Sequence, residues 1–225
     1  MFRSGERFAL FMTGLALVMT LGMVVYDKVV LPKYRAAQAA VMGQGEYVLQ
    51  ATDGQDFTYD SLKGSPSAVF FGFTHCPEVC PTTMGDLATW KEDIPGATDL
   101  RVYFVTVDPA RDRLDQLRDY VSWIPGVIGV TGTQAEIDKA IKAYNVYAKK
   151  VVFDDGSYTM DHSAFVMLFD ENGRYVDSVV YGEPLEVAEA RIKNLVDGNP
   201  LGRGSVLPND LLGILCLEAV KIFGA

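Results

Sequence analysis

The sequence predicts an α/β fold, a central mixed β-sheet flanked by helices, with one N-terminal transmembrane helix. Three observations lead to this prediction. Apolar runs typical of strands alternate with helix-forming segments, two neighbouring runs are spaced as a hairpin, and an apolar run of membrane-spanning length lies near the start. At 225 residues with 49% hydrophobic content, the chain can bury one good core. We therefore expect one globular domain with appendages.

The first element is an uncharged apolar run of 19 residues, positions 8–26, close to the ~20 needed to cross a bilayer as a helix. A cleaved signal peptide is the alternative. The apolar core of a signal peptide is shorter than this run. The small-residue pattern at 37–39, the candidate cleavage site, is separated from the run by three basic residues. We expect residues 1–30 to form an uncleaved membrane anchor, followed by a tether over residues 31–45.

The orientation of this anchor does not follow from charge, because basic residues flank the run on both sides. Only seven residues precede it, too few for an organelle transit peptide. The sequence therefore favours a single-pass protein of the bacterial inner membrane. The whole chain carries 29 acidic against 20 basic residues, a net charge of −9, although the anchor and tether are net basic. A domain this acidic is a poor nucleic-acid binder, so no nucleic-acid partner is expected.

The domain expected over residues 46–197 begins with strands. Residues 47–51 alternate weakly between apolar and polar and are followed by an Asp-Gly turn. Residues 68–73 are β-branched and aromatic, which is typical of a buried strand. A short helix is expected to continue over 86–93, and residues 100–107 alternate as a second strong strand.

Helices and a hairpin complete the predicted domain. Residues 112–123 are expected to form a helix capped by Asp112, and residues 133–145 open with Thr133 and Glu136 in capping-box spacing. Two runs, 164–169 and 175–181, are joined by a turn that contains Asn-Gly, which predicts a β-hairpin. Residues 183–196 are expected to close the domain as a helix.

Cys76 and Cys80 follow the first strong strand, and a proline after each suits a turn that leads into a helix. If the helix begins near Pro77, the two sulfurs lie about one turn apart on one side. Thiols at a helix N-terminus have lowered pKa values, because unpaired backbone N–H groups and the helix dipole favour the thiolate. Such thiolates bind metal or exchange disulfides. A structural disulfide or two packed cysteines are the simpler alternatives.

The order of elements is thioredoxin-like: a parallel β-α-β unit, a hairpin and a final helix, with a cysteine pair at the end of the first core strand. In this topology the strand at 164–169 runs antiparallel beside that at 68–73, which brings His162 beside the cysteines. Two thiolates and an imidazole suit Cu(I) in trigonal geometry and leave zinc one ligand short. The side chain of His75 should point away from that of Cys76, so His75 is expected only to flank the site.

At these residues the chain resembles the Sco/SenC family, the copper chaperones of cytochrome c oxidase assembly. The resemblance covers roughly residues 47–196, and its motifs are GFTHCPEVCP at 72–81, VTVDPARD at 105–112, TGT at 131–133 and Asp161-His162. It implies that Cys76, Cys80 and His162 bind a copper ion. It also implies that the protein delivers copper to the dicopper centre of cytochrome c oxidase subunit II, with its domain facing the periplasm.

Asp108 and Asp112 match an acidic pair of the same family. Asp108 follows a strand that neighbours the cysteine-bearing strand, so it lies at the same edge of the sheet as the site. Each residue has a functional interpretation, support of the ligands or docking of a partner. Each also has a simpler one: Asp108 as a turn residue before Pro109, and Asp112 as a helix cap.

The C-terminal part, residues 198–225, departs from the resemblance. A Gly/Pro-rich linker leads into residues 209–223, which are too short and too charged to span a membrane. One apolar face is available there for docking on the domain or on a partner. The third cysteine, Cys216, is expected to be a packed apolar residue in this segment.

Two functions of different classes remain open. The first is a metallochaperone, which binds and transfers a metal ion and is not a catalyst. The second is a membrane-tethered thiol-disulfide oxidoreductase that reduces cysteines of a partner protein. Both require Cys76 and Cys80, whereas only copper binding requires His162. A peroxiredoxin-like peroxidase has no support beyond the cysteine pattern. Because a disulfide must be reduced before copper can be loaded, a thiol reductant of the thioredoxin class is an expected partner.

Overall fold

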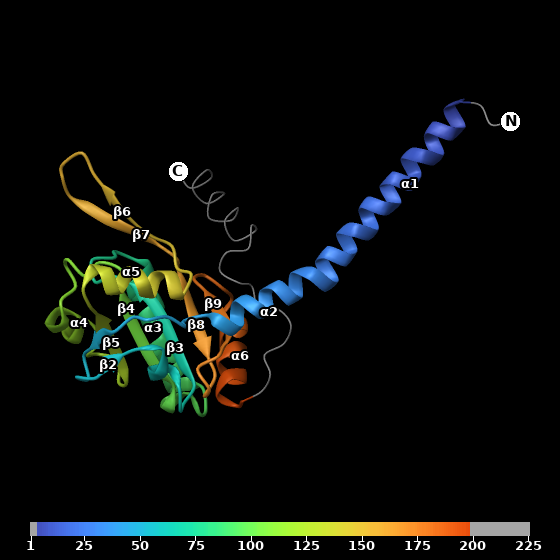
Figure 1. Ribbon diagram of the computed structural model, residues 1–225. Coiled ribbons are helices and arrows are strands. Elements are labelled where there is room, and N and C mark those ends of the chain that lie inside the picture. Colours follow the sequence, from blue (N-terminus) through green and yellow to red (C-terminus); the bar gives the residue numbers. More distant parts are fainter. Residues whose placement is uncertain (1–3, 199–225) are drawn as a thin grey trace. The chain divides into compact units, whose positions relative to one another are not determined.

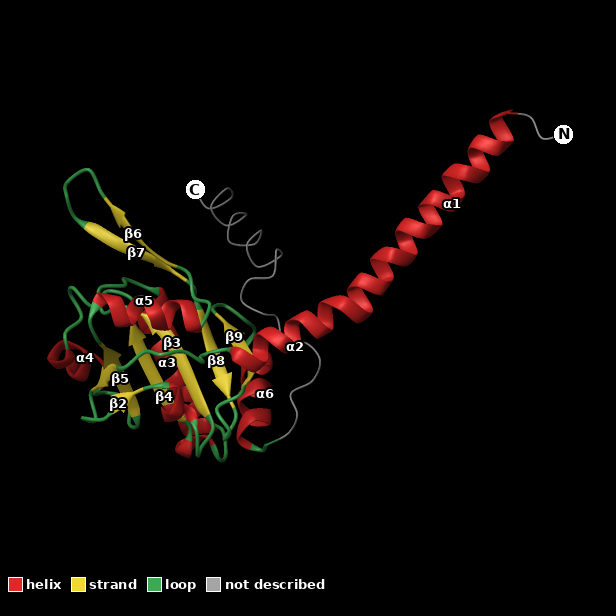
Figure 2. Cartoon of the chain, viewed as in Figure 1, coloured by secondary structure: helices red, strands yellow, loops and turns green. Residues whose placement is uncertain are grey.

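The structure is a computed structural model that describes residues 4–198 (Figures 1 and 2). The chain divides into two compact units, residues Met1–Ala40 and Val41–Ala225. The predicted C-terminal segment at 209–223, with Cys216, lies outside the described residues.

The N-terminal unit is helical. Helix α1 (Ser4–Val25) continues through the π-helical turn η1 (Tyr26–Val30) into α2 (Leu31–Val41). The 32 residues Leu10–Val41 are long and apolar enough to cross a membrane, by length and composition only. The residues expected as a tether are thus helical as far as Val41. Pro32 directly follows the π-helical turn η1, where the ordinary α-helical hydrogen-bond pattern is already interrupted, and the alanines that come after it favour a helix.

A seven-stranded mixed sheet forms the centre of the second unit, in the order β2-β1-β5-β4-β3-β8-β9. Strands β3, β4 and β5 are parallel to one another, whereas β8 runs antiparallel to β3 and pairs with β9 as a hairpin. This arrangement confirms the predicted mixed α/β fold. The strands are β1 (Leu49–Ala51), β2 (Asp56–Phe57), β3 (Ser67–Gly72), β4 (Arg101–Thr106), β5 (Val127–Thr131), β8 (Phe165–Phe169) and β9 (Tyr175–Val180).

Helices flank this sheet (Figure 2). They are α3 (Val79–Asp93), α4 (Leu114–Val121), α5 (Gln134–Ala143) and α6 (Leu185–Val196), with short 3₁₀ turns η2 (Tyr59–Leu62) and η3 (Ala97–Asp99). Every residue of β3 and of β8 is buried. The helices add Leu87, Leu117, Ile137 and Ile192 to the core, each with no exposed surface. Burial of a side chain of this size stabilises the fold by about 2 kcal/mol.

Strand β5 lies where the sequence predicted no strand. It contains Gly129, and glycine weakens the strand signal of a short run. The glycine is required by packing, because a Cβ there would lie 3.0 Å from Cβ of Leu117 and 3.1 Å from Cγ2 of Thr52. Helix α4 therefore packs closely on β5 at this point.

A second hairpin was also not predicted. Strands β6 (Ala148–Val152) and β7 (Tyr158–His162) form a two-stranded sheet of their own. Figure 1 shows this hairpin projecting from the rest of the unit. Its strands are exposed or half-buried along their length, so they lack the apolar pattern from which a buried strand is predicted.

Two predicted helix starts have different outcomes. Helix α4 begins at Leu114 with Arg113 at its N-cap, so the prediction that Asp112 caps this helix is wrong. Thr133 does cap α5, because its hydroxyl accepts a hydrogen bond from the N–H of Glu136 at 3.3 Å. The Glu136 carboxylate, however, accepts from the N–H of Val48 at 2.9 Å and thereby ties α5 to the segment before β1.

Candidate metal centre

Cys76 and Cys80 lie where β3 leads into α3. The helix begins at Val79 rather than near Pro77, so Cys76 precedes the helix and Cys80 lies in its first turn. Sγ of Cys76 accepts a hydrogen bond from the N–H of Cys80 at 3.3 Å. This N–H is one of the donors that a helix N-terminus leaves without an intrahelical partner. The two sulfurs lie close together, as predicted, but one belongs to a loop residue and the other to a helix residue.

The two thiols have opposite pKa shifts. The hydrogen bond with the Cys80 thiol lowers the pKa of Cys76 to about 4, against a smaller effect of burial, and the side chain of His162 and the N–H of Cys80 lower it further. The same contact with Cys76 raises the pKa of the buried Cys80, and burial raises it further. At neutral pH the pair therefore holds one thiolate, on Cys76, and one thiol, on Cys80.

His162, the last residue of β7, completes the cluster. Its Nε2 lies 3.4 Å from Sγ of Cys80. Its Nδ1 lies 3.0 Å from the carbonyl oxygen of Ser163, which accepts a hydrogen bond when Nδ1 carries the proton. That tautomer leaves the lone pair of Nε2 free to bind a metal ion. The ring of Phe73 meets the imidazole at 88° with 5.6 Å between centroids, and this contact holds the ring's orientation.

The sulfur of Cys80 has its space because residue 72 is a glycine. A Cβ on Gly72 would lie 2.9 Å from Sγ of Cys80 and 2.8 Å from Cε2 of Phe104. No side chain fits there without displacing one of these groups. Gly72 belongs to the motif at 72–81, but nothing in the sequence indicates which side chain occupies the space beside it.

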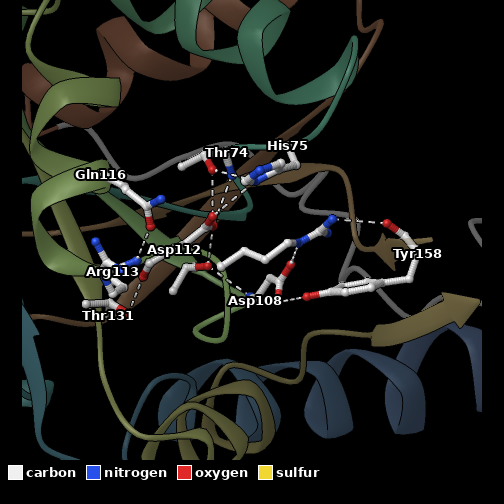
Figure 3. A network of polar contacts seen from close by, with 10 residues as sticks. Thr74, His75, Asp108, Asp112, Arg113, Gln116, Thr131 and Tyr158 are labelled. Atoms are coloured by element: carbon white, nitrogen blue, oxygen red, sulfur yellow. Dashed lines mark hydrogen bonds and ion pairs between the residues drawn. The ribbon is translucent and has the colours of Figure 1, made fainter. Parts of the chain in front are cut away.

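The carboxylate of Asp112 supports the loop that precedes Cys76 (Figure 3). It is fully buried, and it accepts hydrogen bonds from the N–H of Thr74 at 3.0 Å and from the hydroxyls of Thr74 and Thr106, both at 2.6 Å. The hydroxyl of Thr131 donates to the backbone carbonyl of Asp112 at 2.9 Å. A buried carboxylate needs several such donors to offset its lost hydration. Asp112 thus joins the cysteine loop to β4 and β5.

Asp108 also has a role beyond its turn. It lies in the loop after β4, at the edge of the sheet where β3 ends, as predicted. Its side chain is buried, forms an ion pair with Arg111 and accepts a hydrogen bond from the hydroxyl of Tyr158 at 3.1 Å. Tyr158 is the first residue of β7, so this bond connects the loop after β4 to the hairpin that carries His162 (Figure 3).

Within residues 4–198, one group of three or more potential metal ligands of the His, Cys, Asp or Glu type converges: Cys76, Cys80 and His162. Their ligand atoms lie within 4.8 Å of one another. His75 is not in this group. Its half-exposed side chain places Nδ1 3.0 Å from the hydroxyl of Thr74 and 3.7 Å from Oδ1 of Asp112, which agrees with the predicted flanking position.

Comparison with known proteins assigns the family. The family model described as SCO1/SenC matches residues 35–197. The chain belongs to the SCO1/SenC family. Among curated Sco proteins, it is 35% identical over 150 residues to mitochondrial SCO2 of Saccharomyces cerevisiae, covering 64% of this chain and 50% of that one. It is 35% identical over 136 residues to an SCO2-like protein of Rickettsia conorii, covering 59% of this chain and 66% of that one.

The chain therefore spans between about half and two thirds of the length of these curated relatives. Solved structures of Sco proteins share its fold. The copper-bound structure of Bradyrhizobium japonicum ScoI is 39% identical with a TM-score of 0.62, covering 68% of this chain and 99% of that one. The copper-bound structure of yeast Sco1 is 31% identical with a TM-score of 0.62, covering 72% and 91%. The fold is the thioredoxin-like fold of the Sco proteins.

Proposed function

We propose that this Sco protein is a copper metallochaperone that binds Cu(I) through Sγ of Cys76, Sγ of Cys80 and Nε2 of His162. The observation that supports this proposal is the convergence of these three atoms within 4.8 Å, in a chain that resembles two Sco proteins solved with copper bound. Two thiolates and an imidazole are soft donors that suit trigonal Cu(I), whereas a structural zinc site uses four ligands.

The environment of each ligand suits uptake and release. The Cys76 thiolate is half-buried, so it offers an anionic sulfur at the surface of the site. Cys80 is buried and keeps its proton until a metal ion displaces it, which makes copper binding release a proton. Three donors leave room for an incoming ligand of a partner, and ligand exchange then moves copper onward without the free ion leaving the protein.

The partner that we propose as recipient is cytochrome c oxidase subunit II, at its dicopper centre, because the chain belongs to the SCO1/SenC family. We propose that α1 anchors the protein as a single-pass span of the bacterial inner membrane, with the copper-binding domain in the periplasm. The apolar helix supports the anchor. In an oxidising compartment the thiols need a reductant of the thioredoxin class before copper is loaded.

Thiol-disulfide exchange on a partner's cysteines is the second candidate function. It is favoured by the lowered pKa of Cys76 beside the thiol of Cys80, because a thiolate attacks disulfides and a neighbouring thiol can resolve the mixed disulfide. His162 separates the two functions, since its imidazole is a ligand in the first and has no required part in the second.

The test is a Cu(I) competition titration with a chromophoric chelator, on the reduced full-length protein in detergent. We expect one Cu(I) per chain, and a large loss of affinity in Cys76→Ser, Cys80→Ser and His162→Ala, because each removes one of three donors. His75→Ala removes the only other histidine and is the matched control, with affinity unchanged. Wild-type affinity in His162→Ala would exclude the trigonal site and favour the oxidoreductase.

A further inference from the structure

The hairpin that carries His162 is an appendage of the domain. Its two strands, β6 and β7, pair with each other and, in the described part of the chain, with no strand of the main sheet. An isolated two-stranded hairpin is marginally stable in water. The position of His162 relative to the cysteines therefore depends on the contacts that fix the hairpin to the rest of the domain.

The first residue of β7, Tyr158, makes such contacts with the loop after β4. Its hydroxyl donates to Oδ1 of Asp108 at 3.1 Å, and its backbone carbonyl accepts from Nη1 of Arg111 at 3.1 Å. The guanidinium carbon of Arg111 also lies 3.7 Å from the centroid of the Tyr158 ring. Asp108 and Arg111 form an ion pair with each other. We call these three residues the hairpin clamp.

The ion pair of the clamp is largely removed from water. Asp108 is 4% exposed and the Arg111 side chain 24% exposed, which strengthens the attraction between their charges. The carboxylate of Asp108 has partners on both sides, Arg111 in its own loop and Tyr158 in the hairpin. A second cation, Nζ of Lys150, lies 3.6 Å from the Tyr158 ring centroid and adds a contact within the hairpin.

The loop that contributes Asp108 and Arg111 also contributes Asp112. Asp112 accepts hydrogen bonds from the backbone N–H and the hydroxyl of Thr74, two residues before Cys76. A single short loop, residues 108–112, thus contacts both parts of the centre: the segment that leads to the cysteines and the strand that ends in His162. The two parts come from β3–α3 and from β7, which are far apart in sequence.

We propose that Tyr158, Asp108 and Arg111 are positioning residues that keep the imidazole of His162 in reach of the two sulfurs. This inference rests on the copper site proposed above. The clamp acts at one end of β7 and His162 lies at the other, about 13 Å away along an extended strand. When the clamp is lost, β7 keeps its attachment at the His162 end, where the chain leads into β8, and the rest of the hairpin can pivot about that end and displace the imidazole, while the cysteines keep their places on α3 and its preceding loop. The site then offers two sulfurs and binds Cu(I) less tightly.

The experiment compares Cu(I) affinities of full-length variants in detergent by chelator competition. Tyr158→Phe removes the hydroxyl and keeps the ring, and Arg111→Gln removes the guanidinium. We expect affinity to fall about threefold to tenfold in Tyr158→Phe, the effect of losing one hydrogen bond, and further in Arg111→Gln. Lys149→Ala, an exposed position on β6, is the matched control and should bind Cu(I) as the unmodified protein does. Circular dichroism and the unfolding midpoint verify that each variant is folded.

A double-mutant cycle separates positioning from general destabilisation. In a His162→Ala background, Tyr158→Phe should cause no further loss of Cu(I) affinity, because the residue through which it acts is absent. X-ray absorption of the copper-loaded proteins should show less imidazole scattering in Tyr158→Phe than in Lys149→Ala.

Two results would contradict the role of the clamp. One is an unchanged Cu(I) affinity in both Tyr158→Phe and Arg111→Gln. The other is a loss of Cu(I) affinity on Tyr158→Phe that is equally large with His162 and with His162→Ala. A different result concerns the proposed function. If His162→Ala alone leaves Cu(I) affinity unchanged, the three-ligand copper site is wrong, and the clamp has no ligand to position.

Discussion

At the scale of the residue, the chemistry of the centre depends on the opposite pKa shifts of its two thiols. Cys76 accepts hydrogen bonds from the Cys80 thiol and N–H, and its thiolate is stabilised, whereas Cys80 is buried and stays protonated. Helix α3 produces this asymmetry, because its first turn presents an N–H to Cys76 and carries Cys80 inward. The same asymmetry prepares the pair for a metal ion or for disulfide exchange.

The thiolate leads to a prediction about pH. In the copper-free, reduced protein, a group whose pKa is lowered to about 4 stays ionised from neutral pH down to about pH 5 and is protonated as the pH falls through 4. Iodoacetamide reacts with the thiolate, so the rate at which it alkylates Cys76, measured by peptide mapping, should be nearly constant between about pH 5.5 and 8.

The control for this prediction is Cys80→Ala, which removes the thiol that contributes most to the shift. In that variant the pKa of Cys76 should rise and alkylation should slow at pH 6. A rate in the unmodified protein that climbs about tenfold per pH unit up to pH 8, as for an ordinary thiol, would contradict the stabilised thiolate.

At the scale of the element, the centre depends on how closely β3 approaches α3. Gly72 ends β3 and lies against the sulfur of Cys80, so the strand and the helix meet without a side chain between them. The contact cannot relax easily, because Phe104 of β4 closes the other side of the same space.

We predict that Gly72→Ala lowers the free energy of unfolding by about 1–3 kcal/mol, the usual cost of forcing an extra methyl group into a packed core. It should also weaken Cu(I) binding, because the added Cβ displaces Sγ of Cys80. Thermal unfolding and the chelator titration measure the two effects. Gly85→Ala is the matched control: Gly85 lies in α3 with nothing within 4 Å of the added Cβ, so it should be neutral or stabilising. Equal unfolding midpoints for the two variants would contradict this account.

The elements also show where sequence patterns are informative. Strands β3, β4 and β8 were predicted from apolar or alternating runs, and all of their residues but Arg101 are buried, whereas β9 was predicted from the Asn-Gly turn that joins it to β8. Strand β5 contains a glycine that packing requires, and the β6–β7 hairpin has no buried face, so neither has a comparable pattern. The start of α4 was misplaced because Asp112, a good capping residue by type, has stronger partners in Thr74 and Thr106.

At the scale of the whole molecule, the proposed function requires the domain to lie on the oxidising side of a membrane. There a cysteine pair can cycle between dithiol and disulfide. Basic residues on both sides of the apolar run do not decide the orientation.

We predict a cytoplasmic N-terminus and a periplasmic domain. A reporter that is active only in the cytoplasm, fused after Val196, should be inactive, and a phosphatase that requires disulfide formation should be active at the same position. Fusions before residue 8 are the control and should give the opposite pattern. Cytoplasmic activity of the fusion after Val196 would place the domain on the wrong side for the proposed delivery of copper.

The sequence alone predicted a mixed α/β fold, a cysteine pair at a strand-to-helix junction and His162 as a candidate third ligand. These features follow from signals between near neighbours in the chain, namely apolar periodicity, proline placement and the N–H groups of a helix start, together with the antiparallel pairing of two recognisable strands. His162 could be placed because β8 follows it directly and pairs with β3.

Only the tertiary structure decided what surrounds these three candidate ligands. Asp112 reaches Thr74 across 38 positions, and Tyr158 reaches Asp108 across 50. These contacts join common polar side chains, and they form only because the loops and the polar hairpin pack against one another. No local sequence pattern predicts that packing. The fit of Gly72 against Cys80 is of the same kind, because it is set by the spacing of a strand and a helix to within a fraction of an ångström.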